Sequence, residues 1–324
     1  MSPIIISLIL SVIFCGVYIQ LAKKWRIVDH PNERSSHQHP TPHGGGVPLL
    51  LAFLIGFLMV GHWANPYLWL VSGTFVLMLL GVLDDIRSLS VRLRFGVYGL
   101  VGLSTAVFLL KPVGVSAPFI ELAMIVAFAF AIVWALNLYN FMDGIDGIAA
   151  IQCVLACSAA AFLASGQAGE IQYSMICVLL ASAQLGFLVW NWAPARLFMG
   201  DAGSIPTGYL LAGLAGYGAI EGVVPFACWA ILLAVFITDA SWTLMWRMYS
   251  GQKFMQAHRL HAYQRLSRHW DSHRRVVLFL VVVNVFWLFP LAYAVSQWPG
   301  NALYLVILAY FPLVIGMAKV RKLT

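Results

Sequence analysis

Long apolar stretches separated by short polar ones run along the whole chain. A helix needs about 20 apolar residues to cross a bilayer, and runs near that length recur throughout. The eighth of these runs is short and rich in glycine, and only Glu221-Gly222 separates it from the ninth. The pattern predicts an all-α, polytopic helical bundle of about 10–11 transmembrane helices in one domain, residues 1–324. The predicted segments are 3–22, 47–62, 67–83, 94–110, 119–138, 148–164, 172–190, 205–219, 223–246, 276–296 and 301–318.

The composition excludes the soluble globular class. The chain is 61% hydrophobic and only 10% charged, whereas a soluble domain carries about 25% charged residues. The five cysteines lie inside apolar segments and form no CxxC pair, so they are expected to be packing residues rather than disulfides or zinc ligands. The first apolar run ends at Lys23-Lys24 without a cleavage motif, which argues against a removable signal peptide.

Basic residues gather on one side of the predicted map. If the first loop is cytoplasmic, all 19 Lys and Arg residues except Lys111 fall inside, which predicts an N-out, C-in topology. This bias also explains the formal charge of +7 without a nucleic-acid partner. The same face receives the polar loops 23–46, 84–93, 139–147, 191–204 and 247–275.

The centres of the predicted spans are mostly Leu, Val, Ile, Phe and Ala. A transporter usually places polar groups near the bilayer midplane and has paired broken helices, so the pattern argues against that class. Asp239 lies inside the ninth segment, two turns before Arg247. We expect it to have a structural or supporting role.

The stretch Asn137–Ala150 follows the fifth apolar segment and is rich in oxygen-bearing side chains. The pairs Asn137/Asn140 and Asp143/Asp146 are each spaced by three, which places the members of a pair on one helix face. Ionisable groups at a membrane edge are costly and usually functional. The motif therefore predicts ligands for a hard cation or a polar substrate.

Two further carboxylate motifs lie on the same predicted face. Asp84-Asp85 ends the third segment, and is either a metal or phosphate site or a solvated helix end paired with Arg87 and Arg92. Asp201 stands between two glycines before the eighth segment. Asp201 could point at a divalent cation, next to a helix N-terminus that suits an anion. Alternatively, it could be the N-cap of that helix.

The large loop concentrates His258, Arg259, His261 and Arg265 within eight residues. Such a cluster suits phosphate groups; the histidines could instead ligate a transition metal, and the arginines could be positive-inside anchors. The glycine run 44–46 could offer backbone N–H groups to an anion or serve as a flexible entry to a helix.

Together, and in this order, these four motifs resemble the polyprenyl-phosphate N-acetylhexosamine-1-phosphate transferase superfamily, which includes the WecA-like and MraY-like enzymes. The resemblance rests on Asp84-Asp85, 137–147, 199–204 and 258–265, and spans residues 29–268. The chain lacks the His-His-His run of the MraY-like branch, and its His258-Arg-x-His261 pattern is more similar to the O-antigen-initiating, WbpL-type branch.

The resemblance implies a reaction at a bacterial inner membrane, with the active site on the cytoplasmic face. A UDP-N-acetyl sugar, such as UDP-GlcNAc or UDP-FucNAc, would give its sugar 1-phosphate to undecaprenyl phosphate and release UMP, with Mg²⁺ (or Mn²⁺) as cofactor. The alternatives are transfer of phospho-MurNAc-pentapeptide and, in another class, a lipid-linked sugar flippase. Membrane lipid surrounds such a protein, and a homodimer is compatible with its apolar surface.

The resemblance also assigns roles around the metal and the phosphates. Asn140 and Asp201 correspond to the Mg²⁺ ligands. Asp84 corresponds to the group that orients or deprotonates the lipid phosphate, and Asp85 lies against the metal and diphosphate. Arg94 stands where relatives have a lysine near the diphosphate.

The remaining carried-over positions bind the nucleotide and the diphosphate. Asp146 corresponds to the residue that reads the uracil, Gly144 to a backbone contact, and Asp143 to a support of that loop. The diphosphate clamp corresponds to His258, Arg259, His261 and Arg265.

Overall fold

In the computed structural model, residues 2–29, 40–115, 117–165, 171–252 and 259–323 are described, and all eleven predicted segments are helical. One predicted segment consists of two helices and another contains a π-helical turn. The elements are α1 (Pro3–Trp25), β1 (Val28–Asp29), β2 (Thr41–Pro42), α2 (Gly46–Val60), α3 (Asn65–Arg87), α4 (Val91–Leu110), η1 (Lys111–Val113), α5 (Pro118–Met142), α6 (Ile148–Ala164), α7 (Ile171–Asn191), α8 (Asp201–Ile220), α9 (Phe226–Leu232), α10 (Ala234–Tyr249), α11 (Ala262–Trp270), α12 (His273–Val283), η2 (Asn284–Leu288), α13 (Phe289–Gln297), η3 (Pro299–Asn301) and α14 (Ala302–Val320).

The helices make this a polytopic, all-α membrane protein, as the apolar pattern predicts. Within the described residues, seven helices are long and apolar enough to cross a membrane, or eight if α9 and α10 form one bent span. The helices α2 and α6 are apolar but shorter. Among the described residues, the two-residue strands β1 and β2 form one antiparallel pair.

The ninth segment differs from the single helix that its sequence predicts. The chain bends by 73° between α9 and α10. Gln152 of α6 donates a hydrogen bond of 2.9 Å to the Leu232 carbonyl at this bend, and Asn284 of η2 donates to the Gln152 side chain at 3.2 Å. A backbone carbonyl inside a bilayer needs a hydrogen-bond partner. The Gln152 side chain supplies this partner at the break, and Asn284 in turn binds Gln152.

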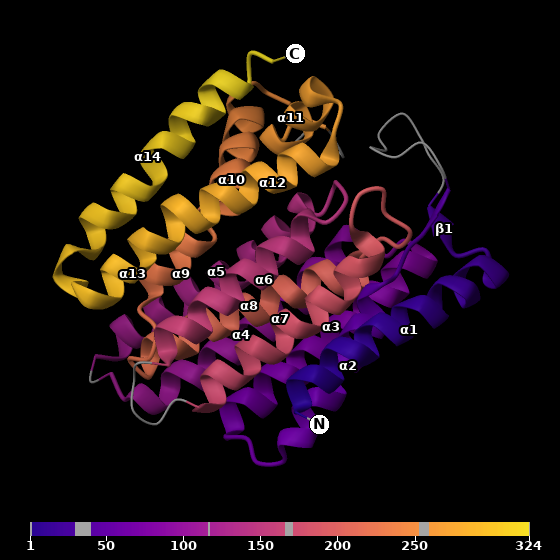
Figure 1. Ribbon diagram of the computed structural model, residues 1–324. Coiled ribbons are helices and arrows are strands. Elements are labelled where there is room, and N and C mark those ends of the chain that lie inside the picture. Colours follow the sequence, from indigo (N-terminus) through magenta and orange to yellow (C-terminus); the bar gives the residue numbers. More distant parts are fainter. Residues whose placement is uncertain (1, 30–39, 116, 166–170, 253–258, 324) are drawn as a thin grey trace.

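The helix α8 forms the centre of the bundle. It is buried along almost its entire length and packs between α3 and α5. In Figure 1, α1 and α2 lie along one edge of the bundle and α12 to α14 along the other, while the two termini lie at opposite ends. The N-terminal end of α8 lies against α2, α3 and α5, which all come from the first half of the chain.

Two segments that the sequence predicts as loops have regular local structure. The predicted loop 247–275 contains the helix α11, whose buried side faces the bundle. In the glycine run, the Gly45 and Gly46 N–H groups donate to the Phe198 and Met199 carbonyls, each at 2.9 Å. The run thus packs against the loop before α8, so these two N–H groups are not open to an anion. All five cysteines are buried and free, as predicted.

Candidate active site

The start of α8 is held by a carboxylate from α3. Gly200 is the N-cap, with φ of 72°, and Asp201 is the first helical residue, so Asp201 is not the N-cap. The backbone N–H groups of Asp201 and Ala202 face the Asp85 carboxylate. A carboxylate at a helix N-terminus satisfies free N–H groups and complements the helix dipole.

Close packing of glycines brings these elements together. A Cβ atom on Gly81, one turn before Asp85, would lie 2.6 Å from the Ala202 Cα. A Cβ on Gly46 would collide with the backbone of Gly203. Both α2 and α3 can therefore approach the start of α8 only because these positions carry no side chain.

Asp201 is surrounded by polar groups from three helices, with Asp84 of α3 among them. The Asn140 Nδ2 atom at the end of α5 donates to the Asp201 Oδ1 at 2.7 Å and to the Ser204 Oγ at 2.9 Å. The Arg94 Nη1 atom of α4 lies 3.7 Å from the Asp201 Oδ2. The sequence motifs around 84, 140 and 201 thus meet at one point.

Asp84 pairs with α4, and its carboxylate also lies close to that of Asp201 on α8. Its Oδ1 accepts the Leu89 N–H at 2.7 Å, and its Oδ2 pairs with Arg94 at 2.6 Å. The arginine partner is therefore Arg94, whereas the sequence suggested Arg87 or Arg92. With both oxygens engaged, Asp84 holds the Arg94 guanidinium beside Asp201.

The oxygen atoms around Asp201 fit a hard cation. The Asp85 Oδ2 is buried and has no hydrogen-bond partner among the described residues, and such an atom is costly unless a ligand or ion completes it. No three His, Cys, Asp or Glu residues in the described ranges form a ready metal site. Mg²⁺ usually uses one or two carboxylates together with substrate phosphates and water. Asp85, Asp201 and the Asn140 amide oxygen suit that kind of shared site.

The loop after α5 forms a second polar cluster. The Asp146 Oδ2 accepts the Ala195 N–H at 3.1 Å and lies 3.2 Å from the His273 Nδ1 at the start of α12. Burial, together with the nearby carboxylates of Asp201 and Asp146, raises the pKa of Asp143 well above its usual value. A side chain on Gly144 would collide with the Tyr263 hydroxyl, so this loop is closely packed under α11.

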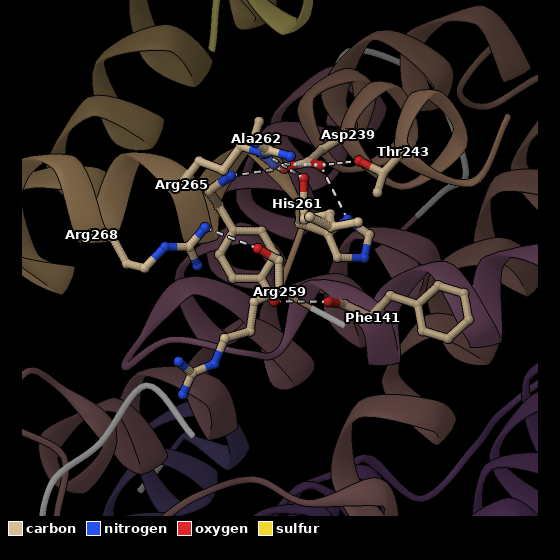
Figure 2. A network of polar contacts seen from close by, with 10 residues as sticks. Phe141, Asp239, Thr243, Arg259, His261, Ala262, Arg265 and Arg268 are labelled. Carbon is tan, nitrogen blue, oxygen red and sulfur yellow. Dashed lines mark hydrogen bonds and ion pairs between the residues drawn. The ribbon is translucent and has the colours of Figure 1, made fainter. Parts of the chain in front are cut away.

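Asp239 docks α11 onto the bundle (Figure 2). Its Oδ1 accepts the Ala262 N–H at 2.9 Å and lies 3.1 Å from the His261 Nδ1, and its Oδ2 accepts the Tyr263 N–H at 3.0 Å. The Tyr263 hydroxyl donates to the Phe141 carbonyl at 2.9 Å. Asp239 therefore acts as a remote cap of α11 and orients the His261 ring, in the supporting role that the sequence predicts.

The basic residues of the large loop point in different directions. Arg265 donates from Nη1 to the Arg321 carbonyl at 3.1 Å, at the end of α14. The Arg259 side chain extends away from Arg265, and its carbonyl accepts from the Arg268 Nη2 at 3.0 Å (Figure 2). His258 lies outside the described residues. The clamp roles of these residues remain predictions, and the structure places Arg265 at α14 rather than among the carboxylates.

Sequence reasoning missed several residues that build the site. His273 and Tyr263 make their contacts through the fold alone, and no local motif marks them. Asn191 is different, because its Oδ1 accepts the Gly147 N–H at 3.0 Å and its Nδ2 donates to the Leu197 carbonyl at 2.9 Å. It ends an apolar segment just as Asn140 does, and this signal would have identified it.

Comparison with known proteins agrees with the motifs. The family model described as glycosyl transferase family 4 matches residues 67–219, which include Asp84, Asp85, Asn140 and Asp201. A probable undecaprenyl-phosphate N-acetylglucosaminyl 1-phosphate transferase of Bacillus subtilis is 29% identical, with 99% of this chain and 90% of that protein covered. A decaprenyl-phosphate N-acetylglucosaminephosphotransferase of Mycobacterium tuberculosis is 28% identical, covering 82% of this chain and 75% of that protein. A phospho-N-acetylmuramoyl-pentapeptide-transferase of Phenylobacterium zucineum is also 28% identical, at 78% and 79% coverage. With the family model over residues 67–219 and relatives of 28–29% identity along most of its length, the chain is similar to the polyprenyl-phosphate N-acetylhexosamine-1-phosphate transferases.

Proposed function

We propose that this protein transfers an N-acetylhexosamine 1-phosphate from a UDP-sugar to undecaprenyl phosphate and releases UMP. The observation that carries the proposal is the meeting of Asp85, Asp201, Asn140 and Arg94 at the buried start of α8. Oxygen ligands and a guanidinium at one point suit a metal-bound diphosphate. GlcNAc is the preferred sugar, because relatives from B. subtilis and M. tuberculosis carry that name along most of this chain.

The residues of the site suggest direct displacement. An oxygen of the lipid phosphate would attack the β-phosphorus of the UDP-sugar, and the bond to the UMP oxygen would break. Mg²⁺, held by Asp85, Asp201 and Asn140, would supply positive charge to the diphosphate. Arg94 would share that charge, positioned by Asp84. Because the lipid phosphate is already anionic at neutral pH and Asp84 is fully engaged, we assign Asp84 to positioning rather than to proton abstraction.

The second polar cluster is proposed as the uridine site. Asp146 would read the base, with Gly144 as a backbone contact and Asp143 as support. The raised pKa of Asp143 favours its neutral form, which can donate a hydrogen bond. Arg259 and His261 would face the diphosphate from the side of α11, with His258 in the adjoining segment. Arg265 would act only if it leaves the carbonyls of α14.

The setting of the reaction follows from the charge pattern. The basic face marks the cytoplasmic side, so the UDP-sugar would arrive from the cytosol and the polyprenyl phosphate from the inner leaflet of a bacterial inner membrane. We also propose an N-out, C-in topology and assembly as a homodimer. The product would initiate O-antigen or another surface polysaccharide. The His258-Arg-x-His261 pattern favours this product over a peptidoglycan intermediate.

Release of UMP tests the proposal. Membranes that contain the protein are supplied with undecaprenyl phosphate, Mg²⁺ and a panel of UDP-N-acetyl sugars, and lipid-linked product is scored for each. We expect product with UDP-GlcNAc or a close relative, and none from Asp201→Asn expressed at an equal level. Retained activity in Asp201→Asn would contradict the metal assignment. Product only from UDP-MurNAc-pentapeptide would favour the alternative substrate. Movement of lipid-linked sugar across the membrane without UMP release would indicate a flippase.

Exchange of labelled UMP into the UDP-sugar without acceptor distinguishes two routes. A covalent aspartyl-phosphate intermediate would permit this exchange. Direct displacement requires both substrates together, so we expect no exchange.

A further inference from the structure

Two adjoining cavities border α11 where it meets α10 and α14. The first, of about 80 Å³, is formed where α10, α11 and α14 meet. The second, of about 210 Å³, is enclosed mainly by α10, α11, α12 and α14. Ala262 and Met317 line both, so the two cavities are neighbours on one path into the bundle.

The smaller cavity is basic. Its lining includes Arg247, Arg265 and Arg321 and, among the described residues, no carboxylate. Arg247 is only 4% exposed. The Arg321 guanidinium lies 3.2 Å from the centroid of the Trp246 ring, and Arg265 donates to the Arg321 carbonyl at 3.1 Å. An anion bound in this cavity would be attracted by guanidinium groups from α10, α11 and the end of α14.

The larger cavity is mainly apolar, and Asp239, the one carboxylate in its lining among the described residues, accepts the N–H groups at the start of α11. Leu280 and Val283 of α12 line one side, and Leu313 and Gly316 of α14 line another. A Cβ atom on Gly316 would meet nothing within 4 Å, so the space continues up to the α14 backbone. A void of this size between membrane helices suits an acyl chain better than water, because its lining offers few polar partners.

We propose that these cavities together bind one resident anionic phospholipid, with the phosphodiester beside the three arginines and the start of one acyl chain in the apolar cavity. The charge of the smaller cavity selects an anionic headgroup, and Trp246 in its lining lies in the last turn of α10, where interfacial aromatics are common. Bound lipid would brace α11 against α10 and α14.

The polyprenyl acceptor does not fit this site as well. Its phosphate must reach Asp201 and Asn140, whereas α11 stands between those residues and the arginines: Tyr263 contacts the Phe141 carbonyl on one side, and Arg265 reaches α14 on the other. The proposed lipid is therefore a structural ligand rather than a substrate.

Thermal unfolding of the purified full-length protein in detergent tests the proposal. Dioleoyl-phosphatidylglycerol should raise the apparent Tm of the wild type by about 5 °C through preferential binding to the folded state. Dioleoyl-phosphatidylcholine and inorganic phosphate should raise it much less. Each variant is compared with its own lipid-free Tm, so a direct effect on stability cancels.

Two variants probe the two halves of the site. Arg321→Gln removes headgroup charge, and Gly316→Leu fills the apolar cavity while keeping every charge. Each variant should lose at least about half of the lipid-dependent rise in Tm, because the loss of either contact weakens lipid binding. The matched controls are Lys319→Gln, in the same helical turn but outside the lining, and Gly99→Leu, at another open glycine on α4. Both controls should keep the full rise.

Four results would overturn the proposal. Equal rises in Tm with the two lipids would show that the headgroup is not selected. A full rise in Tm in Arg321→Gln or Gly316→Leu would show that the lipid binds elsewhere. A rise with inorganic phosphate as large as that with lipid would indicate a simple anion site. Undecaprenyl phosphate that displaces phosphatidylglycerol at lower concentration would assign the cavities to the acceptor. If Arg321→Gln does not fold, Gly316→Leu alone decides the outcome.

Discussion

The contact between α3 and α8 makes Gly81→Ala the sharpest test of the site. The new methyl group would lie 2.6 Å from both the N and Cα atoms of Ala202 and 2.7 Å from the carbonyl carbon of Asp201. Carbon atoms pack at about 3.5–4.0 Å, so the start of α8 must retreat from α3 by about 1 Å. The displaced atoms are backbone, which cannot rotate away as the end of a flexible side chain can.

This shift should reduce activity much more than stability. Overpacking of one methyl group costs about 1–3 kcal/mol, and the long bundle has other contacts that hold it together. Displacement by about 1 Å of a catalytic group can cost about 100-fold in rate. Asp85 lies one turn after Gly81, and the substitution would separate it from Asp201 across the proposed cation site. We therefore expect UMP release to fall about 100-fold, with a higher Mg²⁺ concentration needed for half-maximal rate.

Gly99→Ala is the matched control for this substitution. Gly99 lies in α4, and a Cβ atom there would meet nothing within 4 Å. Both variants gain the same helix propensity, so only Gly81→Ala should lose activity. Initial rates of UMP release, measured at equal amounts of folded protein, compare the two. If Gly81→Ala keeps a rate within about twofold of the wild type, the close approach of α3 does not place Asp201 and the reasoning fails.

Three further outcomes are expected. Asp239→Asn should cut the rate of UMP release about 10–100-fold, because a buried charged hydrogen bond contributes about 1.5–3 kcal/mol; Thr243→Val, which loses only the 3.2 Å hydrogen bond to the same carboxylate, should cost much less, and equal losses would contradict the capping role. His273→Gln should raise KM for the UDP-sugar about tenfold with little change in kcat if Asp146 binds the base, whereas a fall confined to kcat would place Asp146 elsewhere. Treatment with EDTA should abolish UMP release and added Mg²⁺ should restore it, so activity that persists in EDTA would exclude the proposed cation.

Hydropathy and local motifs predicted the features that depend on neighbouring residues. Each membrane segment is apolar over its own length, so its existence could be read directly from the chain. Asn140, Asp143 and Asp201 stand at the ends of such segments, where a polar side chain is conspicuous. Their convergence was expected from the charge bias, because all of these ends fall on the basic face.

Features that depend on distant residues were not predictable in this way. Asp239 caps a helix that begins 23 positions later, and nothing near Asp239 marks it as a cap. The bend at Leu232 has no proline or glycine at the break, and the compensating Gln152 comes from α6. Gly81 looks like any small residue in an apolar segment until α8 is packed against it.

The adjacent carboxylates of α3 illustrate how one helix end can serve two purposes. Successive residues on a helix point about 100° apart, so Asp84 and Asp85 make different main contacts although both lie near Asp201. Asp84 turns toward α4 and fixes Arg94, while Asp85 turns toward α8 and meets the first N–H groups of that helix. The positive guanidinium and the proposed cation site therefore both adjoin Asp201. A diphosphate bound between them would be neutralised from both sides, which neither carboxylate alone could arrange.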